Sequence, residues 1–314
     1  MLSQHRVFLH DATGNSKPVI RLDRPVTVGD RPVTVGDRPV TVGDRPVTVV
    51  TAFYLIPSKF KEKDYVKWMS NFLPVIPCHL YVFTDQESYL QVKTQRSSFP
   101  QNITKYIVRP FSQLTEAKRL PMWSKQRKLD REKENHSPEL YALWNEKVHL
   151  LMEAINDNPF DSDYFLWTDI GSFRNKEQAK NLSSFPDTHT TAALLGMDKV
   201  FFLQIGKFHQ GHLQIGRNGL PVRDFQHNFG LAGTVFGGHS NALRKYEKRY
   251  YATMELMRRN GLFIGKDQNI MSTVAVLYPE LVKLVRPQPY LGGADRWFYS
   301  HYYFSKRPLN ETAE

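Results

Sequence analysis

Short apolar runs of strand length alternate with segments of helical spacing, and this alternation restricts the fold more than any other feature of the chain. The strands we predict are Val47–Tyr54, Leu80–Phe83, Ile103–Val108, Tyr164–Trp167, Val200–Leu203, Leu231–Phe236 and Leu281–Val285. The helices we predict are Asp64–Phe72, Ser137–Ile155, Asn241–Arg259 and Asp267–Val276. This alternation predicts a largely parallel sheet with helices on both faces, and such sheets bind ligands at the carboxyl ends of their strands.

A seven-residue repeat precedes the first predicted strand. The segment Arg24–Asp30 recurs identically twice, and a further copy begins at Arg45 before it diverges into the strand. Repeats this short, with a proline and a glycine in each, cannot bury a core of their own. We therefore expect residues 1–44 to be a disordered extension and residues 45–314 to form a single domain.

Charge, cysteine content and hydropathy exclude several classes of protein. Cys78 is the single cysteine, which excludes an internal disulfide and a cysteine-based zinc site. The formal net charge is +11, but the densest basic stretch, Lys118–Lys133, has acidic residues interleaved and no nucleic-acid motif beside it, so we expect no nucleic-acid partner. No apolar run reaches the ~18–20 residues of a membrane helix. We therefore expect a cytoplasmic protein without an integral membrane segment, or one in the Golgi or another secretory lumen if an N-terminal anchor is missing.

Two polar segments follow predicted strands, and each has a functional and a structural interpretation. Asp169 comes just after the apolar strand that ends at Trp167. It can hold a divalent cation that neutralises a diphosphate, or it can cap the next segment. The glycines from Gly230 to Gly238, with Gly237 and Gly238 at the end, allow a ligand to approach the backbone closely, or they form a turn that ends the strand.

Two further segments lie nearer the C-terminus. Asp267 and Gln268 begin a predicted helix, where they can hold the hydroxyl groups of a sugar, or where Asp267 can cap the helix. His301 can ligate a metal and Lys306 can meet a phosphate, or both can belong to an ordinary amphipathic segment. Each feature is weak alone, and it is their order along the chain that is informative.

That order resembles the layout of GT-A nucleotide-sugar transferases, and four segments look similar to the HtrL/YibB family. The four segments are Val49–Tyr54, Trp144–Lys147, Phe165–Gly171 and Gly265–Asn269. The resemblance extends from about Val47 to Phe304, and in bacteria the family is associated with envelope polysaccharide genes. It implies a GT-A-like catalytic domain, a mixed and mostly parallel sheet, a nucleotide-sugar donor and a carbohydrate acceptor.

One position departs from the usual Asp-x-Asp motif of these transferases, because Trp167 stands where the first aspartate would be. From the resemblance we expect Asp169 and His301 to hold Mn²⁺ or Mg²⁺. We expect Asp267 or Gln268 to act at the reacting carbon or on the acceptor hydroxyl. The remaining donor-binding residues that we predict are Asp85, Lys147, Trp167, Gly237, Gly238 and Lys306.

The helix that contains the Trp144–Lys147 segment makes a further prediction. Its apolar stripe should bury Trp144 against the sheet, and Lys147 on the neighbouring edge of the stripe should lie near the ligand.

Two other functions are compatible with the same sequence. One is a non-catalytic protein that kept the fold and binds a sugar or a nucleotide sugar, and the other, motivated by the charge, is a nucleic-acid-binding protein.

Overall fold

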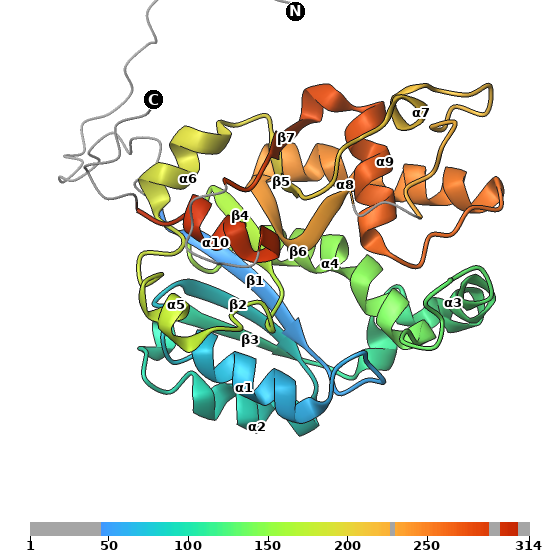
Figure 1. The fold of residues 1–314 in the computed structure, drawn as a ribbon. Coiled ribbons are helices and arrows are strands. Elements are labelled where there is room, and N and C mark those ends of the chain that lie inside the picture. The colour runs from blue at the N-terminus through green and yellow to red at the C-terminus, as the bar shows by residue number, and fades with distance from the viewer. Residues whose placement is uncertain (1–44, 227–229, 289–295, 307–314) are drawn as a thin grey trace, which may run out of the picture. The chain divides into compact units, whose positions relative to one another are not determined.

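The computed structural model describes residues 45–226, 230–288 and 296–306, which form an α/β structure (Figure 1). The chain divides into the units Met1–Pro39 and Val40–Glu314, and every described residue belongs to the second unit. The expectation for residues 1–44 lies outside the described residues.

A seven-stranded mixed sheet, in the order β3-β2-β1-β4-β6-β5-β7, forms the centre of this unit. The strands are β1 Val47–Phe53, β2 His79–Thr84, β3 Thr104–Val108, β4 Tyr164–Thr168, β5 Val200–Gln204, β6 Leu231–His239 and β7 Val282–Val285. Strand β6 is antiparallel to both of its neighbours, β4 and β5, whereas the other neighbouring strands pair in parallel. The predicted α/β class with a mostly parallel mixed sheet is confirmed, and the arrangement is compatible with a Rossmann-like fold.

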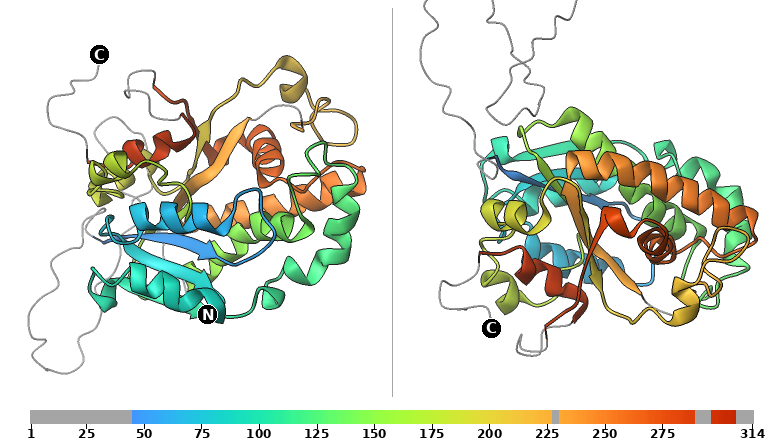
Figure 2. Two further views of the ribbon diagram at one scale, coloured as in Figure 1. Left: turned by 60° about the horizontal axis from the view of Figure 1, so that its bottom comes forward. Right: turned by 90° about the horizontal axis from the view of Figure 1, so that it is seen from above.

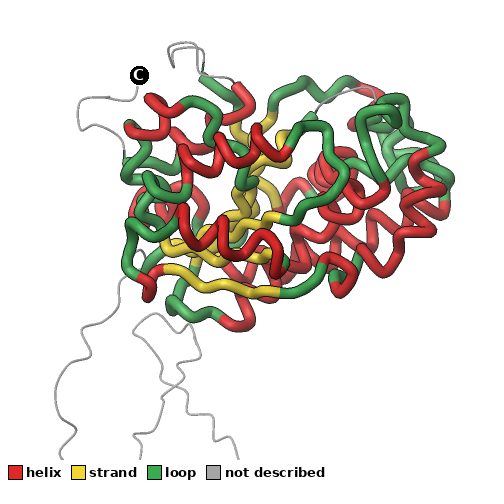
Figure 3. The backbone as a smooth tube through the Cα atoms, turned by 90° about the horizontal axis from the view of Figure 1, so that it is seen from below, coloured by secondary structure: helices red, strands yellow, loops and turns green. Residues whose placement is uncertain are grey.

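Helices cover both faces of this sheet (Figures 2 and 3). The α-helices are α1 Glu62–Phe72, α2 Gln86–Gln95, α3 Leu120–Arg127, α4 Pro138–Asp157, α5 Lys176–Lys180, α6 Thr188–Leu195, α7 Gln210–Leu213, α8 Ser240–Arg259, α9 Asp267–Leu277 and α10 Tyr299–Tyr303. The 3₁₀ turns are η1 Gln101–Ile103, η2 Phe111–Gln113, η3 Ala117–Arg119, η4 Pro279–Leu281 and η5 Arg296–Phe298. None of the helices within the described ranges is long and apolar enough to pass through a bilayer.

The side chains of each strand alternate between two hydrophobic cores. In β4, Phe165 and Trp167 join the core under α4, α8 and α9, whereas Tyr164 and Leu166 join the core under α1, α2, α6 and α10. Because Asp169 follows Trp167 by two positions, the alternation places it on the α4 side as well.

Helix α4 carries a charged side chain, Lys147, that is buried on the side of the sheet facing α4, α8 and α9. Oγ of Ser137 accepts the backbone N–H of Leu140 at 3.1 Å, Pro138 occupies the first turn, and Asn158 ends the helix in the left-handed conformation at φ 36°. The helix buries most of its length, including Lys147. The predicted boundaries and the cap are confirmed here.

The end of β6 differs from the prediction. The strand continues through Gly237 and Gly238 to His239 and does not turn after Phe236. Glycine is required here for close pairing, because a Cβ on Gly237 would lie 2.1 Å from the carbonyl oxygen of Phe165. The two glycines therefore serve the contact between strands, and the predicted turn is wrong.

Candidate functional site

The candidate site lies at the carboxyl edge of the sheet, where β1 and β4 end side by side. The chain leaves β1 toward β2 on one side, whereas β4 lies on the other, so the strand order changes direction at this point. In open α/β sheets, ligands bind in the crevice at such a switch point. Two adjoining hollows open there, with volumes of about 210 and 380 Å³, and we call them together the cleft.

Lys147 lies at the centre of the cleft wall and brings together residues distant in sequence. Its Nζ is 3.0 Å from Oδ1 of Asp169, 2.9 Å from Oδ2 of Asp267, and 2.9 Å from the carbonyl oxygen of Gly233. The Lys147 side chain is only 4% exposed, and those of Asp169 and Asp267 are 34% and 5% exposed. The predicted position of Lys147 beside Asp169 is confirmed, and Asp267 shares the same cleft.

The neighbouring charges affect the protonation of Lys147 and Asp267. Burial opposes the charge on Lys147, but Asp169 and Asp267 outweigh it and raise the pKa of the ammonium group, so Lys147 stays charged. Burial also raises the pKa of the Asp267 carboxyl, and Lys147 opposes part of that rise. A buried carboxyl of this kind is typical of a functional site.

The two oxygens of the Asp267 carboxylate have different partners. Oδ1 of Asp267 accepts the backbone N–H of Gln268 at 2.9 Å. Oδ2 is also buried, and its described polar partner is the ammonium group of Lys147, 2.9 Å away. A carboxylate oxygen can accept a second hydrogen bond, so a ligand's O–H group could be stabilised here.

Asp169 is held from its own strand. The indole Nε1 of Trp167 donates a hydrogen bond of 2.7 Å to Oδ1 of Asp169, and Nζ of Lys147 lies 5.7 Å from the centre of the same indole. The residue two positions before Asp169 therefore holds its carboxylate in place.

Aromatic rings and cations form the rest of the wall. Trp144 and Trp167 line the cleft on the α4 side, and Trp68 and Phe298 line it opposite. The guanidinium of Arg174 lies 4.3 Å from the ring centre of Trp68 and 5.1 Å from that of Phe298. Lys59 also lines the cleft, and Lys266 lines it while paired with Glu132. A wall of flat rings with a few charged groups suits a ligand that has both apolar faces and negative charge.

Several predicted residues lie elsewhere or have another role. Trp144 is partly buried against the core under α4, as predicted in part, and it also lines the wall of the cleft. Gly237 and Gly238 lie inside the sheet, paired with Leu166 and Phe165, away from the end of β4. The glycine at the site is Gly233, where a Cβ would be 2.8 Å from Oδ2 of Asp267.

Two predicted donor contacts also belong to other parts of the fold. Asp85 caps α2, because its Oδ1 accepts the N–H of Ser88 at 2.7 Å. Lys306 is exposed, its backbone N–H bonds to Ser184, and it does not line the cleft. Gln268 does line the cleft, and its side-chain amide donates to the carbonyl oxygen of Leu231 at 3.0 Å.

One of the two predicted metal ligands, His301, does not line the cleft. His301 is 2% exposed, its ring packs against Phe173 and Phe185, and its Nε2 lies 3.1 Å from Oγ of Ser172. Burial lowers the pKa of this imidazole to about 3. No group of three or more potential metal-ligating side chains occurs in the part of the chain that the structure describes.

The geometry around Asp169 also disfavours a metal bridge to Asp267. A cation bound to Oδ1 of Asp169 and Oδ2 of Asp267 would have to replace Nζ of Lys147, which already lies about 3 Å from both. With Lys147 in place, the residues present do not fit the expected Mn²⁺ or Mg²⁺ at this position.

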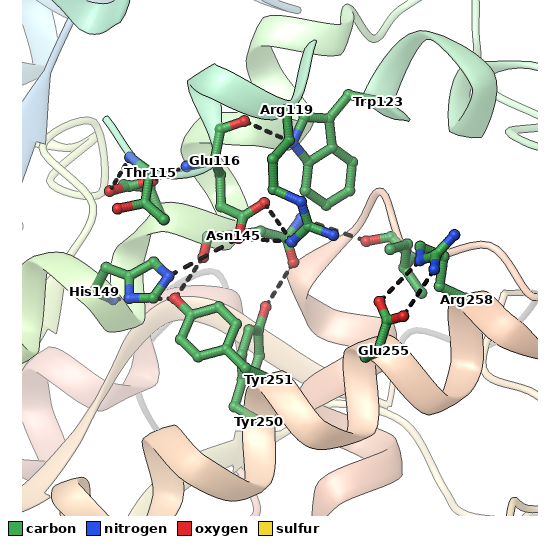
Figure 4. Close-up of polar contacts among 12 residues, drawn as sticks. Thr115, Glu116, Arg119, Trp123, Asn145, His149, Tyr250, Tyr251, Glu255 and Arg258 are labelled. Carbon is green, nitrogen blue, oxygen red and sulfur yellow. Dashed lines mark hydrogen bonds and ion pairs between the residues drawn. The ribbon is translucent and has the colours of Figure 1, made fainter. Parts of the chain in front are cut away.

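A second polar network holds α4 behind the cleft (Figure 4). The Asn145 side chain accepts a hydrogen bond of 2.7 Å from Tyr250 on α8, and it donates one of 3.1 Å to the carbonyl oxygen of Gly265. The next residue, Glu146, accepts the backbone N–H groups of Thr115 and Glu116. These contacts position the start of α9 relative to Lys147.

No family model matches the sequence, and a search of the curated proteins finds no match.

Proposed function

We propose that this chain is a glycosyltransferase that moves a sugar from a nucleotide-sugar donor to a hydroxyl group of a saccharide or similar acceptor. The observation that carries the proposal is the buried carboxylate of Asp267 in the cleft, whose Oδ2 has the Lys147 ammonium group as its only described polar partner. A sugar hydroxyl would donate a second hydrogen bond to this oxygen. Asp169 and Gln268, which line the same cleft, would accept or donate further hydrogen bonds to the sugar ring.

The aromatic rings and cations of the cleft wall suit the nucleoside diphosphate part of such a donor. The rings of Trp68, Trp144 and Phe298 offer flat apolar surface for a nucleobase or a sugar face. Arg174 and Lys59 would meet the diphosphate, whose charge grows as it leaves. In this proposal Lys147 does not bind phosphate, because three protein oxygens already surround its ammonium group.

A ligand panel tests the proposal. The melting temperature of the protein is measured with UDP-glucose, UDP-galactose, UDP-N-acetylglucosamine, GDP-mannose and GDP-fucose, with EDTA and with Mn²⁺. A ligand at one hundred times its dissociation constant stabilises the folded state by about 2.7 kcal/mol, so at least one donor should raise the melting temperature by several degrees. Release of the nucleoside diphosphate then distinguishes a transferase from a protein that only binds the donor.

The variant Asp169→Asn sharpens this test. The amide is nearly isosteric with the carboxylate, so the fold should persist while donor stabilisation is lost. Asp198→Asn is the matched control. The Asp198 side chain is 79% exposed, and its Oδ1 lies 3.8 Å from Nζ of Lys245. Equal donor stabilisation in the wild type and in Asp169→Asn would remove Asp169 from the site, and no stabilisation by any donor would contradict the proposed function.

A further inference from the structure

A buried histidine–carboxylate pair lies in the wall of the cleft beside the residues already described. Nδ1 of His136 is 2.7 Å from Oδ2 of Asp130, and the same oxygen accepts the hydroxyl of Tyr141 at 2.6 Å. Oδ1 of Asp130 accepts the backbone N–H of Glu132 at 2.9 Å. The side chains of His136 and Asp130 are 4% and 2% exposed, so the pair is fixed in one geometry.

This arrangement selects the tautomer of His136. Burial alone would raise the pKa of the Asp130 carboxyl, but the hydrogen bonds from Tyr141 and His136 outweigh it and lower that pKa, so Asp130 stays ionised. An ionised Asp130 requires the proton of a neutral His136 on Nδ1, which leaves the lone pair on Nε2.

Nε2 of His136 forms no hydrogen bond with any described residue, and it is not among the fully enclosed polar atoms without a partner, whereas Nε2 of His212 is. His136 lines the cleft together with Lys147, Asp169 and Asp267. Its ring meets the edge of Trp144, with ring centres 5.1 Å apart.

Asp267, the base expected from the sequence, is less suited to take a proton. Its Oδ1 holds the N–H of Gln268 and its Oδ2 lies against the ammonium of Lys147. His136 has the buried carboxylate that orients it and an unused ring nitrogen, which is the geometry of a general base.

We propose that His136 is the catalytic base that activates the acceptor, with Asp130 as the positioning residue, and this proposal rests on the transferase function proposed above. Nε2 of His136 takes the proton of the acceptor hydroxyl while that oxygen forms its bond to the anomeric carbon. The bond from this carbon to the donor phosphate breaks, and the nucleoside diphosphate leaves with the electron pair. The imidazolium then loses its proton to solvent. A single displacement of this kind inverts the anomeric configuration.

The pH dependence follows from the protonation of Nε2. The charged and titratable groups that contact His136 or line the same hollows are Asp130, Tyr141, Glu132, Arg127, Lys59, Lys266, Lys147, Asp169, Arg174, Asp267, Glu134 and Glu139. Because only the neutral imidazole accepts a proton, the rate should fall toward low pH in the wild type. In a variant without His136, the remaining rate should no longer fall toward low pH.

The experiment measures nucleoside diphosphate release from the panel donor that stabilises the wild type most, with water and with methyl glycosides as acceptors. We expect His136→Gln and Asp130→Asn to lower the rate about 10²–10⁴-fold, the range for loss of a general base, with an unchanged thermal shift by the donor. Imidazole in the buffer should restore part of the rate to His136→Gly. His189→Gln, an exposed histidine on α6, is the matched control and should keep the wild-type rate.

The outcomes separate the two proposals. If a donor binds and is turned over by His136→Gln at the wild-type rate, or if the acidic decrease persists in that variant, His136 is not the base and the transferase function stands. If both variants lose donor binding and imidazole restores nothing, the pair is structural and the inference is overturned. If no donor binds the wild type or is turned over by it, the transferase function itself fails, and with it the base.

Discussion

Nζ of Lys147 lies 2.9 Å from Oδ2 of Asp267, so the middle of α4 presents a cation to the first residue of α9. Both side chains are almost completely buried. The pair occupies the floor of the cleft and determines which charges a ligand meets there.

Replacing the ammonium group of Lys147 with the uncharged end of a methionine should convert the floor of the cleft into a metal site. Lys147→Met leaves Asp169 and Asp267 facing each other without a counter-charge, and removal of one partner from a buried ion pair costs about 3–5 kcal/mol. We expect a large decrease in melting temperature that Mn²⁺ partly reverses, because the two carboxylates then share a hard cation. The wild type should respond little to Mn²⁺ or EDTA.

The control for this prediction is Lys67→Met on the exposed side of α1. It should change neither the melting temperature nor the response to Mn²⁺. Stabilisation of the wild type by Mn²⁺ as large as that of Lys147→Met would show that Lys147 does not occupy the cation position.

The hydrogen bond from Trp167 to Asp169 should matter for binding more than for folding. Trp167→Phe removes a donor 2.7 Å from a charged acceptor, a bond worth about 1.5–3 kcal/mol, from a carboxylate that is partly exposed and can rehydrate. We expect donor affinity to fall about tenfold, since 1.4 kcal/mol corresponds to a factor of ten. Trp123→Phe is the matched control, because the Trp123 indole bonds to the carbonyl of Glu116 and the residue does not line the cleft. It should lower stability and leave the affinity unchanged.

A single methyl group at Gly233 should displace the floor of the cleft. The Cβ of Gly233→Ala would lie 2.8 Å from Oδ2 of Asp267, closer than such atoms approach, so the carboxylate would have to move. We expect loss of donor stabilisation and a destabilisation of about 1–3 kcal/mol, measured by urea unfolding. At Gly216 an added Cβ would lie 3.2 Å from Oδ1 of Asn218, so only a small shift is needed and Gly216→Ala should cost less stability and leave donor binding unchanged. Normal binding in Gly233→Ala would separate Gly233 from the ligand site.

The Glu116 carboxyl behind the cleft should make folding stability depend on pH. Burial raises its pKa from 4.5 to about 7, so the folded state holds this proton more tightly than the unfolded state does. The contribution of Glu116 is therefore complete below about pH 4.5 and is lost as the pH rises through 7. Neighbouring His149 has the opposite sign, because burial lowers its pKa to about 4 and its contribution is lost as the pH falls.

Glu116→Gln should remove the first of these two effects. Its free energy of unfolding, relative to that of the wild type, should rise by on the order of 2 kcal/mol between pH 5 and pH 8, since one pKa unit is about 1.4 kcal/mol. Urea unfolding at both pH values measures the difference. The same relative stability at pH 5 and pH 8 would show that Glu116 ionises normally in the folded protein.

The sequence was most informative where burial is continuous along an element. The strand that ends at Trp167 and the stripe on α4 are both nearly fully apolar, so their ends could be located and Lys147 could be placed beside Asp169. Helix α2 was not predicted because its apolar residues do not form a clear stripe, and Asp85, which caps it, was assigned to the ligand instead.

The remaining errors arise where one residue type suits two environments. Gly237 fits a turn and a tight strand contact equally well, and only the neighbouring strand shows which applies. The sequence around His301 does not reveal that aromatic rings enclose it. The pair of Asp130 and His136 was missed because two such residues six positions apart are common, and only the buried hydroxyl of Tyr141 makes the pair distinctive.

The aromatic wall of the cleft has a practical consequence for spectroscopy. Of the five tryptophans in the chain, Trp68, Trp144, Trp167 and Trp297 line the cleft, whereas Trp123 is buried elsewhere. The intrinsic fluorescence of the protein therefore originates largely from the place where a ligand would bind. A nucleobase stacked on these indoles would quench their emission, so the fluorescence of the unlabelled protein would measure ligand binding. Trp123→Phe would remove most of the background emission.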